Sequence, residues 1–561
     1  MQLLGKAQDP SFWEEVRSKE IFKDFREMLL CHWENDCVGY EPEALRYSEY
    51  KLFWTTGDRA TYQKSYWSRR YNLDVAAMLA LIYPEEQKYV DFAMEMIYTI
   101  CDEYSWCIPA HQKVLEINDN CRIDLFASET GYRFAEILTL LGDRLEPLIR
   151  NRIMAEVERR IVKPFTSVGN YGWWENGHMN WTAVCMGSVA NTMMLLFPEK
   201  ADEAFIERAN RSIEGFLEGF KDDGMCLEGC AYWGYGFGFF MLYADMVRRY
   251  TDGKVDFFKR DKVKTVATFL QKMFLTEGCT VSFADGGAKF SYDVGRMHYL
   301  KNEYPDDILV YDRKYASFGY GKFCILLRDA IWLDERLLAD TADETVETEC
   351  FAPDSHWLVK RTKNYGFAAK GGYNKEPHNH NDIGNFIFAK EGKQIICDMG
   401  AGPYTRQYFS NDTRYQMIEC RSGGHNLPIV AGVEQSFGEQ FKAKDVTYEN
   451  GVLTMDITGA YECEGLESII RSFKLDDDGI TLTDKFVYSG EGDIICRMYS
   501  HIEPALIEPG KVRIGICTLS YDPAKAECTA HKDLRTNKSS VIYRIEFKLY
   551  DGVKEFSCSL K

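Results

Sequence analysis

The densest group of side chains that could do chemistry is the segment PHNHNDIGNF, residues 377–386. His378, His380 and Asp382 follow one another at a spacing of two residues, so in an extended chain they would share one face. Imidazoles and a carboxylate on one face are ligands that a divalent metal ion accepts. Because the chain has only 10 histidines, this clustering favours a metal site over histidines that merely fill the core.

Two further candidate ligands follow in the sequence. The arms of FIFAKEGKQII are expected to pair across Glu391-Gly392, and this hairpin would bring Asp398 near the histidines. His425 lies in RSGGHNLPIV, just before another apolar strand. Side chains that converge from three strands predict a divalent-metal site; polar residues on a hairpin surface are the alternative.

A second cluster occupies NYGWWENGHMNWTAVCMGSVA, residues 170–190, just before a predicted helix. The tryptophans could stack on sugar rings while the polar pair grips a carboxylate. Alternatively, the polar residues cap the helix and the tryptophans are core. The residues in question are Trp173, Trp174, Trp181, His178 and Asn180.

A third cluster, CLEGCAYWGYGFGFF, spans residues 226–240. Its glycines allow a close approach of the backbone. Tyr232 and Tyr235 could point into a cleft, although for Tyr235 packing in an aromatic core is the better interpretation.

The elements that must position these clusters are helical from about residue 10 to 325. Apolar residues recur at helical spacing in KYVDFAMEMIYTIC and IRNRIMAEVERRIV. Further helices are expected at 73–82, 124–141, 181–196, 201–220, 236–251 and 262–275, with prolines at their boundaries. Many similar helices joined by short loops are typical of a solenoid or a closed α/α ring, although no sequence repeat fixes a period.

After about residue 340 the sequence changes to short β-rich runs, such as HWLVKRT and SIIRSFKLDDDGITLTDKFVYSG. The turn pairs Glu391-Gly392, Asn450-Gly451 and Asp478-Gly479 separate them and indicate hairpins. We therefore predict a helical (α/α) domain over residues 1–335 and an antiparallel β-sandwich over residues 336–561. The stretch 326–352 is the expected junction, and a cleft between the domains is the default site.

Composition excludes several classes of function. The 561 residues carry a net charge of −19, so no long-range positive field exists to recruit nucleic acid or an anionic membrane. Aromatic residues reach 14%, a surplus that suits stacking on sugars. No apolar run approaches the ~18 residues of a membrane span.

The N-terminus, MQLLGKAQDPSFWEEV, lacks the apolar stretch of a secretory signal. The 18 cysteines are scattered, often in apolar runs, and show no zinc-ribbon spacing. We therefore expect a reducing, cytoplasmic location, or a periplasmic or secreted one if a leader has been lost.

The chain resembles the heparinase II/III-like family of polysaccharide lyases. The resemblance rests on WENGHMNWTAVCMGSVA, GMCLEGCAYWGYG and HNHNDIGNFIFAKEGKQIICDMG with the later GGHN. These motifs occur in the family's order and span most of the chain. The resemblance implies an incomplete α/α toroid followed by an antiparallel β-sandwich.

The resemblance also implies roles for individual residues. It makes Tyr232 the catalytic tyrosine and His378 the catalytic histidine, and it places the group that neutralises the substrate carboxylate at Asn180 or His178. It further implies one structural divalent ion, zinc first, with manganese or calcium as alternatives. The implied ligands are His380, Asp398 and His425.

Cleavage of a 4-O-linked uronate by β-elimination explains these residue types. Neutralising the carboxylate stabilises the enolate-like transition state, a base removes the C5 proton, and an acid protonates O4. A tyrosine that acts as the base at neutral pH needs positive charge nearby to lower its pKa. The candidate sources are Arg69, Arg70, Arg122 and Arg421, although a solvated helix face or an internal ion pair explains each of them equally well.

The sequence therefore predicts a carbon–oxygen lyase that acts on uronate-containing oligo- or polysaccharides of glycosaminoglycan type. Trp173, Trp174, Arg122 and Arg421 would bind the substrate, and no nucleic acid or membrane would be a partner. Two alternatives remain: a non-catalytic carbohydrate-binding or scaffold protein, and an α/α-toroid glycoside hydrolase. Carboxylates for a hydrolase are available at Glu175, Asp223, Glu228 and Asp285. The polymer, endo or exo action and homo-oligomer formation stay open.

Overall fold

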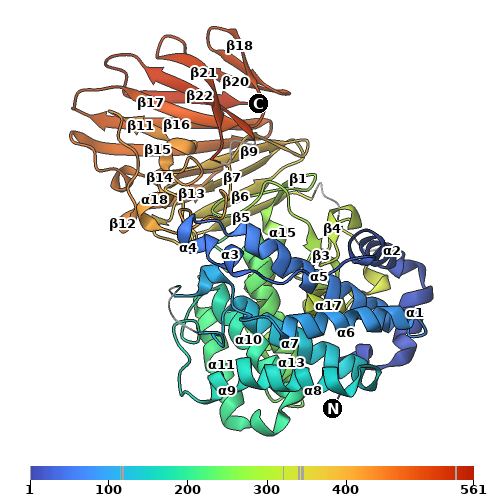
Figure 1. Cartoon of the computed structure of the whole chain (residues 1–561). Coiled ribbons are helices and arrows are strands. Elements are labelled where there is room, and N and C mark those ends of the chain that lie inside the picture. Colours follow the sequence, from blue (N-terminus) through green and yellow to red (C-terminus); the bar gives the residue numbers. More distant parts are fainter. Residues whose placement is uncertain are drawn as a thin grey trace. The chain divides into compact units, whose positions relative to one another are not determined.

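The computed structural model describes residues 2–113, 115, 119–319, 321–338, 341–342, 346–536 and 540–561. The chain divides into two compact units (Figure 1). The first, called here the helical unit, comprises residues 1–220, 234–264 and 292–341. The second, called the sheet unit, comprises residues 221–233, 265–291 and 342–561.

The helical unit alternates helices that are buried all round with helices that keep one exposed face. In α7 (Leu125–Leu141) and α10 (Asn180–Leu196) nearly every side chain is buried, whereas α6 (Gln87–Cys101) and α11 (Glu203–Glu218) bury only one stripe. A helix that is apolar on all sides belongs inside a bundle and an amphipathic one belongs outside. This inner–outer alternation is the incomplete α/α toroid that was predicted.

The remaining main helices of the unit complete this pattern (Figure 1). They are α1 (Pro10–Ser18), α2 (Lys23–His32), α5 (Ala60–Ile82), α8 (Pro147–Val157), α13 (Gly238–Tyr250), α16 (Val294–Glu303) and α17 (Phe323–Ile331). Helices α5 and α6 pack together, as do α7 and α10, and α10 also contacts α11 and α13. Among the described residues, no helix has both the length and the apolar character needed to cross a membrane.

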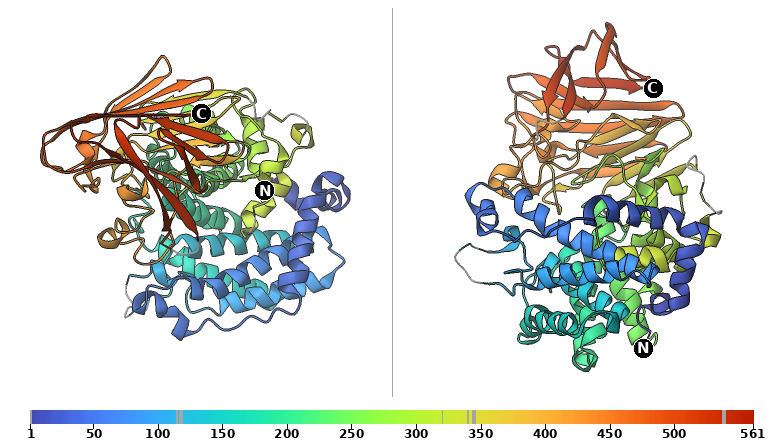
Figure 2. Two further views of the ribbon diagram at one scale, coloured as in Figure 1. Left: turned by 90° about the horizontal axis from the view of Figure 1, so that it is seen from above. Right: turned by 45° about the vertical axis from the view of Figure 1, so that its right-hand side comes forward.

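The sheet unit is built from antiparallel sheets whose strands can be followed in both views of Figure 2. The largest sheet has eight strands, in the order β13 (Lys444–Glu449), β14 (Val452–Asp456), β15 (Leu466–Asp476), β16 (Gly479–Tyr488), β23 (Glu555–Leu560), β20 (Cys517–Tyr521), β19 (Lys511–Ile514) and β18 (Pro504–Glu508). A five-stranded sheet has the order β10 (Lys393–Ile396), β9 (Phe386–Lys390), β7 (Gly366–Lys370), β6 (Trp357–Arg361) and β5 (Thr348–Ala352). A four-stranded sheet has the order β11 (Pro428–Val430), β17 (Ile494–Ser500), β22 (Val541–Leu549) and β21 (Ala526–Leu534).

One hydrophobic core draws buried side chains from all three sheets, which is the packing of a β-sandwich. The predicted hairpins form at Glu391-Gly392 and Asn450-Gly451, where both turn residues have positive φ. The third turn differs by one residue: Gly479 pairs with Asp476 as part of β16, so the turn residues are Asp477 and Asp478.

The expected boundary at residues 335/336 misses two excursions of the chain. Residues 221–233 and 265–291 belong to the sheet unit although they precede that boundary. Within 265–291, strands β1 (Phe274–Thr276) and β2 (Cys279–Thr280) form a hairpin, and β1 contacts β6 and β7. The helix predicted at 262–275 accordingly breaks into α14 (Asp261–Ala267) and α15 (Phe269–Met273) before β1 begins.

A buried ion pair ties the large sheet to two loops. Arg471 on β15 lies directly opposite Asp484 on β16, and its Nε and Nη2 donate to the two carboxylate oxygens at 2.7 Å each. Its Nη1 donates to the carbonyl oxygens of Gly384 (2.8 Å) and Asn426 (2.5 Å). Arg471 therefore fixes the ends of the 375–385 and 415–427 loops to the sheet.

Replacing Arg471 with Met should destabilise the sheet unit by about 3–5 kcal/mol, because Asp484 would stay buried without its partner. The measurement is the urea midpoint followed by circular dichroism. In the matched control, Lys511→Met, the pair with Glu508 is exposed and the midpoint should hardly move. The double variant Arg471→Met/Asp484→Leu should recover part of the loss, and an unchanged midpoint in Arg471→Met would contradict this account.

Candidate active site

His378 lies in a loop of the sheet unit, not on a strand. Its φ of +56° is in the left-handed region, which non-glycine residues rarely adopt. The expectation that residues 378, 380 and 382 share one face of an extended chain is therefore wrong. Asp382 turns away to an ion pair with the buried Lys370 at 2.7 Å. Unusual backbone conformations of this kind cluster at functional sites because the surrounding structure must hold them in place.

What holds His378 is Asp285, a carboxylate whose side chain is completely buried. Its Oδ2 accepts hydrogen bonds from His378 Nδ1 (2.6 Å) and the Tyr404 hydroxyl (3.1 Å). Its Oδ1 accepts from His380 Nε2 (3.3 Å), from Arg414 Nη2 (3.2 Å) and from the Tyr408 hydroxyl. Five donors thus converge on one carboxyl group.

The donors keep this carboxylate ionised. Burial alone would raise the pKa of Asp285, but the hydrogen bonds from His378 and His380 outweigh it and hold the pKa well below its usual range. Burial and the charge of Asp285 raise the pKa values of Tyr404 and Tyr408 far above normal. Both tyrosines therefore stay protonated and donate to Asp285.

A close approach of two loops places Asp285 there. Gly400 has a φ of +63°, and a Cβ on it would lie 2.0 Å from the carbonyl oxygen of Gly286. Ser282 donates a hydrogen bond to the carbonyl oxygen of Asp398 at 3.1 Å. Only glycine at position 400 lets the Asp285 loop pack this tightly on the chain that follows β10.

Tyr232 completes the site from the first excursion of the chain, residues 221–233. It ends the short helix α12 (Cys230–Tyr232), which continues into a π-helical segment, Trp233–Phe237, a local geometry that is frequent at functional sites. Its ring stacks on His378 with a centroid distance of 4.0 Å, and its hydroxyl lies 3.0 Å from that of Tyr404. The Tyr404 hydroxyl donates its hydrogen bond to Asp285, so in the contact between the two tyrosines the Tyr232 hydroxyl is the donor and the Tyr404 oxygen is the acceptor.

A second carboxylate faces the other side of the imidazole. Glu228 Oε2 lies 3.3 Å from His378 Nε2. Of the four carboxylates considered for a hydrolase, Glu228 and Asp285 therefore both contact His378. Glu175 instead pairs with Arg208 at 2.6 Å, and Asp223 accepts hydrogen bonds from Ser355.

The three metal ligands implied by the resemblance do come together. One ligand atom each of His380, Asp398 and His425 lies within 4.8 Å of the others, and all three residues are buried. His380 donates from Nε2 to Asp285, and His425 donates from Nδ1 to Asp398 (3.1 Å). In each ring the second nitrogen takes no part in these two hydrogen bonds.

Those two nitrogens, His380 Nδ1 and His425 Nε2, are buried and have no hydrogen-bond partner among the described residues. Unpaired buried polar atoms are costly, and a cation would satisfy both. Asn385 donates to Asp398 at 2.5 Å and so fixes the carboxylate. The donor set of two imidazoles and one carboxylate fits a divalent transition-metal ion.

The second cluster lies in the helical unit, and its residues separate by exposure. The side chain of Trp173 is 52% exposed, whereas that of Trp174 is 3% exposed and donates its indole N–H to the carbonyl oxygen of Ile123. Trp174 is therefore a core residue, and the expectation that it binds substrate is wrong. Trp181 is partly exposed and contacts the ring of Trp173 at 5.0 Å.

These two tryptophans begin a row of six partly exposed rings, which we call the aromatic row. Successive centroids are 4.5–6.1 Å apart. His111 is fixed within it by a hydrogen bond from Nδ1 to Asp124 at 2.7 Å. In order, the row consists of Trp173, Trp181, His111, Phe126, Trp67 and Tyr71.

Asn180 and His178 occupy different environments. Asn180 is the first residue of α10 and is buried, and a Cβ on Gly236 would lie 3.0 Å from its side chain. His178 is exposed, and its Nδ1 lies 2.7 Å from the carbonyl oxygen of Gly215 in α11. The ring of His178 therefore caps a backbone carbonyl near the end of α11.

The arginines considered as sources of positive charge are mostly paired with carboxylates. Arg421 is exposed and forms a two-pronged ion pair with Glu434, so its charge is already paired at the surface, and its role in substrate binding stays a prediction. Arg69 and Arg70 both pair with Glu103 at 3.2 and 2.8 Å, which is the internal ion pair weighed as an alternative. Arg122 is partly exposed, and the ion pair it forms within the described part of the chain is a long one, 3.9 Å to Asp119.

Sequence reasoning missed most of the groups around His378. Asp285 was considered only as a hydrolase acid, and Tyr404, Tyr408 and Arg414 were not considered at all. A weak signal existed in FADGG, where two glycines follow an acid in an apolar run, and in PYTRQYF. Asp285 is 93 positions from His378 and 129 positions from Arg414, and no spacing rule connects residues so far apart in the sequence.

The chain was compared with known proteins by sequence and by fold. No protein-family model matches the sequence, and a search of curated proteins finds no match. Among solved structures, heparinase III matches with a TM-score of 0.63 at 13% identity, covering 88% of this chain and 76% of that one. A mutant of the heparan sulfate lyase HepC from Pedobacter heparinus matches with a TM-score of 0.59 at 12% identity, covering 100% and 87%. The chain has the heparinase-like polysaccharide lyase fold.

The likeness extends to a lyase for a different glycan. The Streptomyces coelicolor A3 chondroitin AC lyase, solved in complex with chondroitin sulphate, matches with a TM-score of 0.56 at 9% identity, covering 98% of this chain and 82% of that one. The heparinase-like fold is thus shared by structures that act on different glycosaminoglycans. At these identities the comparison establishes the fold of the chain, and any argument about its substrate has to rest on the chain's own residues.

Proposed function

We propose that this chain is a lyase that cleaves uronate-containing oligo- or polysaccharides of glycosaminoglycan type by β-elimination. One observation carries the proposal: Tyr232 and His378 are stacked at 4.0 Å and both connect to the buried Asp285 carboxylate. An acid and a base held side by side are what the elimination requires. The lyases with this fold act on heparan sulfate and chondroitin sulphate, which supports an acidic glycan as substrate.

Asp285 prepares the histidine for the role of base. By accepting the hydrogen bond from Nδ1, it orients the ring so that Nε2, which faces Glu228 at 3.3 Å, is the nitrogen that can exchange a proton. His378 would take the C5 proton at Nε2, and Tyr232 would donate its proton to the leaving O4. Where C5–H and O4 lie on one face, Tyr232 could perform both transfers.

The substrate carboxylate needs a hydrogen-bond donor or a cation that neutralises it. We place this role on Asn180, which is held in a buried position at the start of α10, whereas His178 is exposed and its Nδ1 already bonds the Gly215 carbonyl. A hydrogen bond from its amide would stabilise the enolate-like transition state. The aromatic row would stack sugar rings, starting at the exposed Trp173, and Arg122 is a candidate for a charged contact.

We further propose that His380, Asp398 and His425 hold one divalent ion, zinc by its ligand preference. Bound there, the ion would supply charge that fixes the loops of residues 380, 398 and 425. The protein's own residues would then do the chemistry, because His380 reaches Asp285 through its second nitrogen. The role of the ion is therefore structural.

Replacing Tyr232 with Phe should lower kcat by about 10²–10⁴-fold on every substrate, since the leaving group loses its acid. His378→Ala should be most damaging on iduronate-type substrates, where C5–H and O4 lie on opposite faces, and milder on glucuronate-type substrates. The measurement is the initial rate of formation of the unsaturated product at its ultraviolet absorbance, on paired substrates.

Tyr550→Phe provides the matched control, because Tyr550 is an exposed tyrosine of the sheet unit and its loss should leave the rate unchanged. Folding of each variant is checked by circular dichroism. Full activity of a folded Tyr232→Phe variant would falsify the proposed mechanism.

Replacing Asp285 with Asn should lower kcat about 10–100-fold, because an amide no longer fixes the orientation of the His378 ring. KM should change far less, since Asp285 is buried and does not reach the substrate. Asp493→Asn, at an exposed ion pair with Lys548, is the control. A loss confined to KM would contradict the role given to Asp285.

Elemental analysis of the purified chain should find about one zinc or similar ion per molecule. His425→Ala should lower both metal content and melting temperature, because the ion ties separate segments together. The exposed His531 offers the matched control, His531→Ala, with full metal content. Unchanged occupancy in His425→Ala would refute the ligand assignment.

A further inference from the structure

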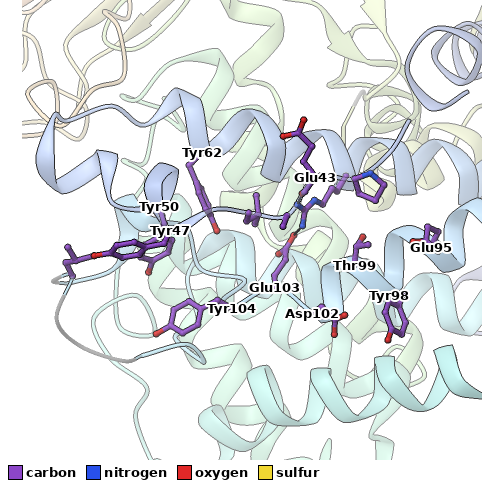
Figure 3. Close-up of a pocket in the computed structure, with 15 residues that line it drawn as sticks. Glu43, Tyr47, Tyr50, Tyr62, Glu95, Tyr98, Thr99, Asp102, Glu103 and Tyr104 are labelled. Carbon is purple, nitrogen blue, oxygen red and sulfur yellow. Dashed lines mark hydrogen bonds and ion pairs between the residues drawn. The ribbon is translucent and has the colours of Figure 1, made fainter. Parts of the chain in front are cut away.

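A pocket of about 640 Å³ opens in the helical unit, and no step of the proposed reaction uses it. It lies between the 42–50 segment, the start of α5 and the C-terminal half of α6, as Figure 3 shows. Its volume falls within the range of small-molecule sites, about 300–1,000 Å³. Tyrosines dominate its lining: Tyr47, Tyr50, Tyr62, Tyr98 and Tyr104.

The tyrosines offer both ring faces and hydroxyls. Tyr50 packs edge-on against Tyr62 at 5.6 Å and against Tyr104 at 6.0 Å, so the three rings present faces at right angles. Tyr47, Tyr98 and Tyr104 keep 66%, 40% and 52% of their side chains exposed. The apolar face of a tyrosine ring can stack on the C–H groups of a sugar, and the tyrosine hydroxyl can hydrogen-bond to the sugar hydroxyls.

The charges around the pocket point to an uncharged ligand. Of the four carboxylates among the described lining residues, Glu43 pairs with Arg46, Asp102 with Arg152, and Glu103 with Arg69 and Arg70. Among the described lining residues Arg69 is the one cation, and it is paired with Glu103, which also pairs with Arg70. A uronate or sulfate would meet carboxylates there, and a polyamine would find most of them already paired. Carboxylates that are paired in this way still accept hydrogen bonds from hydroxyl groups.

The pocket also shares a hydrophobic cluster with the aromatic row. Tyr62, Tyr66 and Ile108 form its buried centre, and Tyr50, Trp67 and Phe126 pack against that centre. Tyr50 lines the pocket, whereas Trp67 and Phe126 belong to the row. One rigid cluster therefore supports two aromatic surfaces of the same unit.

We propose that this pocket is a second glycan-binding site, selective for uncharged sugar residues. It would hold neutral or N-acetylated sugars by ring stacking on the exposed tyrosines. Glu95 and Thr99, which line it on α6 (Figure 3), would accept hydrogen bonds from sugar hydroxyls. The site does not depend on catalysis, so it stands or falls independently of the lyase proposal.

Isothermal titration calorimetry of the full chain with N,N′,N″-triacetylchitotriose as the probe tests the proposal. We expect saturable binding, and we expect it to weaken at least about tenfold in both Tyr98→Ala and Tyr104→Ala. Both side chains are largely exposed, so the fold should survive, which circular dichroism verifies. Tyr550→Ala, an equally exposed tyrosine of the sheet unit, should bind like the unaltered chain.

Trigalacturonate and spermidine serve as the anionic and cationic probes, and each should bind at least about tenfold more weakly at this pocket. Three outcomes would overturn the proposal: no saturable binding of triacetylchitotriose, undiminished binding in both tyrosine variants, or a preference for either charged probe that the tyrosine variants abolish. Because no turnover is measured, none of these outcomes bears on the lyase mechanism.

Discussion

The buried charge of Asp285 is the constraint around which the sheet unit's polar residues are arranged. An ionised carboxylate with no access to water is strongly unfavourable unless donors surround it. Here His378, His380, Tyr404, Tyr408 and Arg414 all point at it. Each donor is thereby fixed in orientation. The stacked pair of Tyr232 and His378 and the orientation of the His380 ring are consequences of satisfying one anion.

The sequence predicted elements and motifs well because these depend on neighbours along the chain. Strand alternation and the turn pair Asn450-Gly451 are local signals, and the hairpins form there. Helical periodicity located the helices, but the ring they form could not be derived from it. Inner helices such as α10 are buried on all sides and have no polar face. Their sequences therefore do not alternate between apolar and polar residues in a way that shows how the helices are arranged in the ring.

The site was only partly predictable for a related reason. The triad of His380, Asp398 and His425 could be carried over from motifs, whereas Asp285 reaches His378 across 93 positions without any pattern in the sequence. Adjacent residues also diverged: Trp173 is exposed and Trp174 is buried, because the loop turns between them. Side-chain direction in a loop is set by tertiary packing, which composition and spacing do not encode.

The distribution of arginines limits how this acidic chain could recognise the acidic glycan that we propose as its substrate. Several guanidinium groups form ion pairs inside the protein: Arg70 with Glu103, Arg133 with Asp74 and Arg471 with Asp484. Little positive charge is left to attract a polyanion over a distance. Recognition of the proposed substrate would then depend on short-range contacts, namely stacking and hydrogen bonds from neutral donors.

The two early excursions of the chain into the sheet unit also constrain how the protein folds during synthesis. Residues 221–233 and 265–291 leave the ribosome long before the strands that they pack against. At about 5–20 residues per second, tens of seconds pass before the last strand is made. The helical unit can therefore form first, while Tyr232 and Asp285 meet His378 and Tyr404 only after those later residues are made. A protein cut at the apparent domain boundary would lose both residues from the sheet unit and could not regain the site.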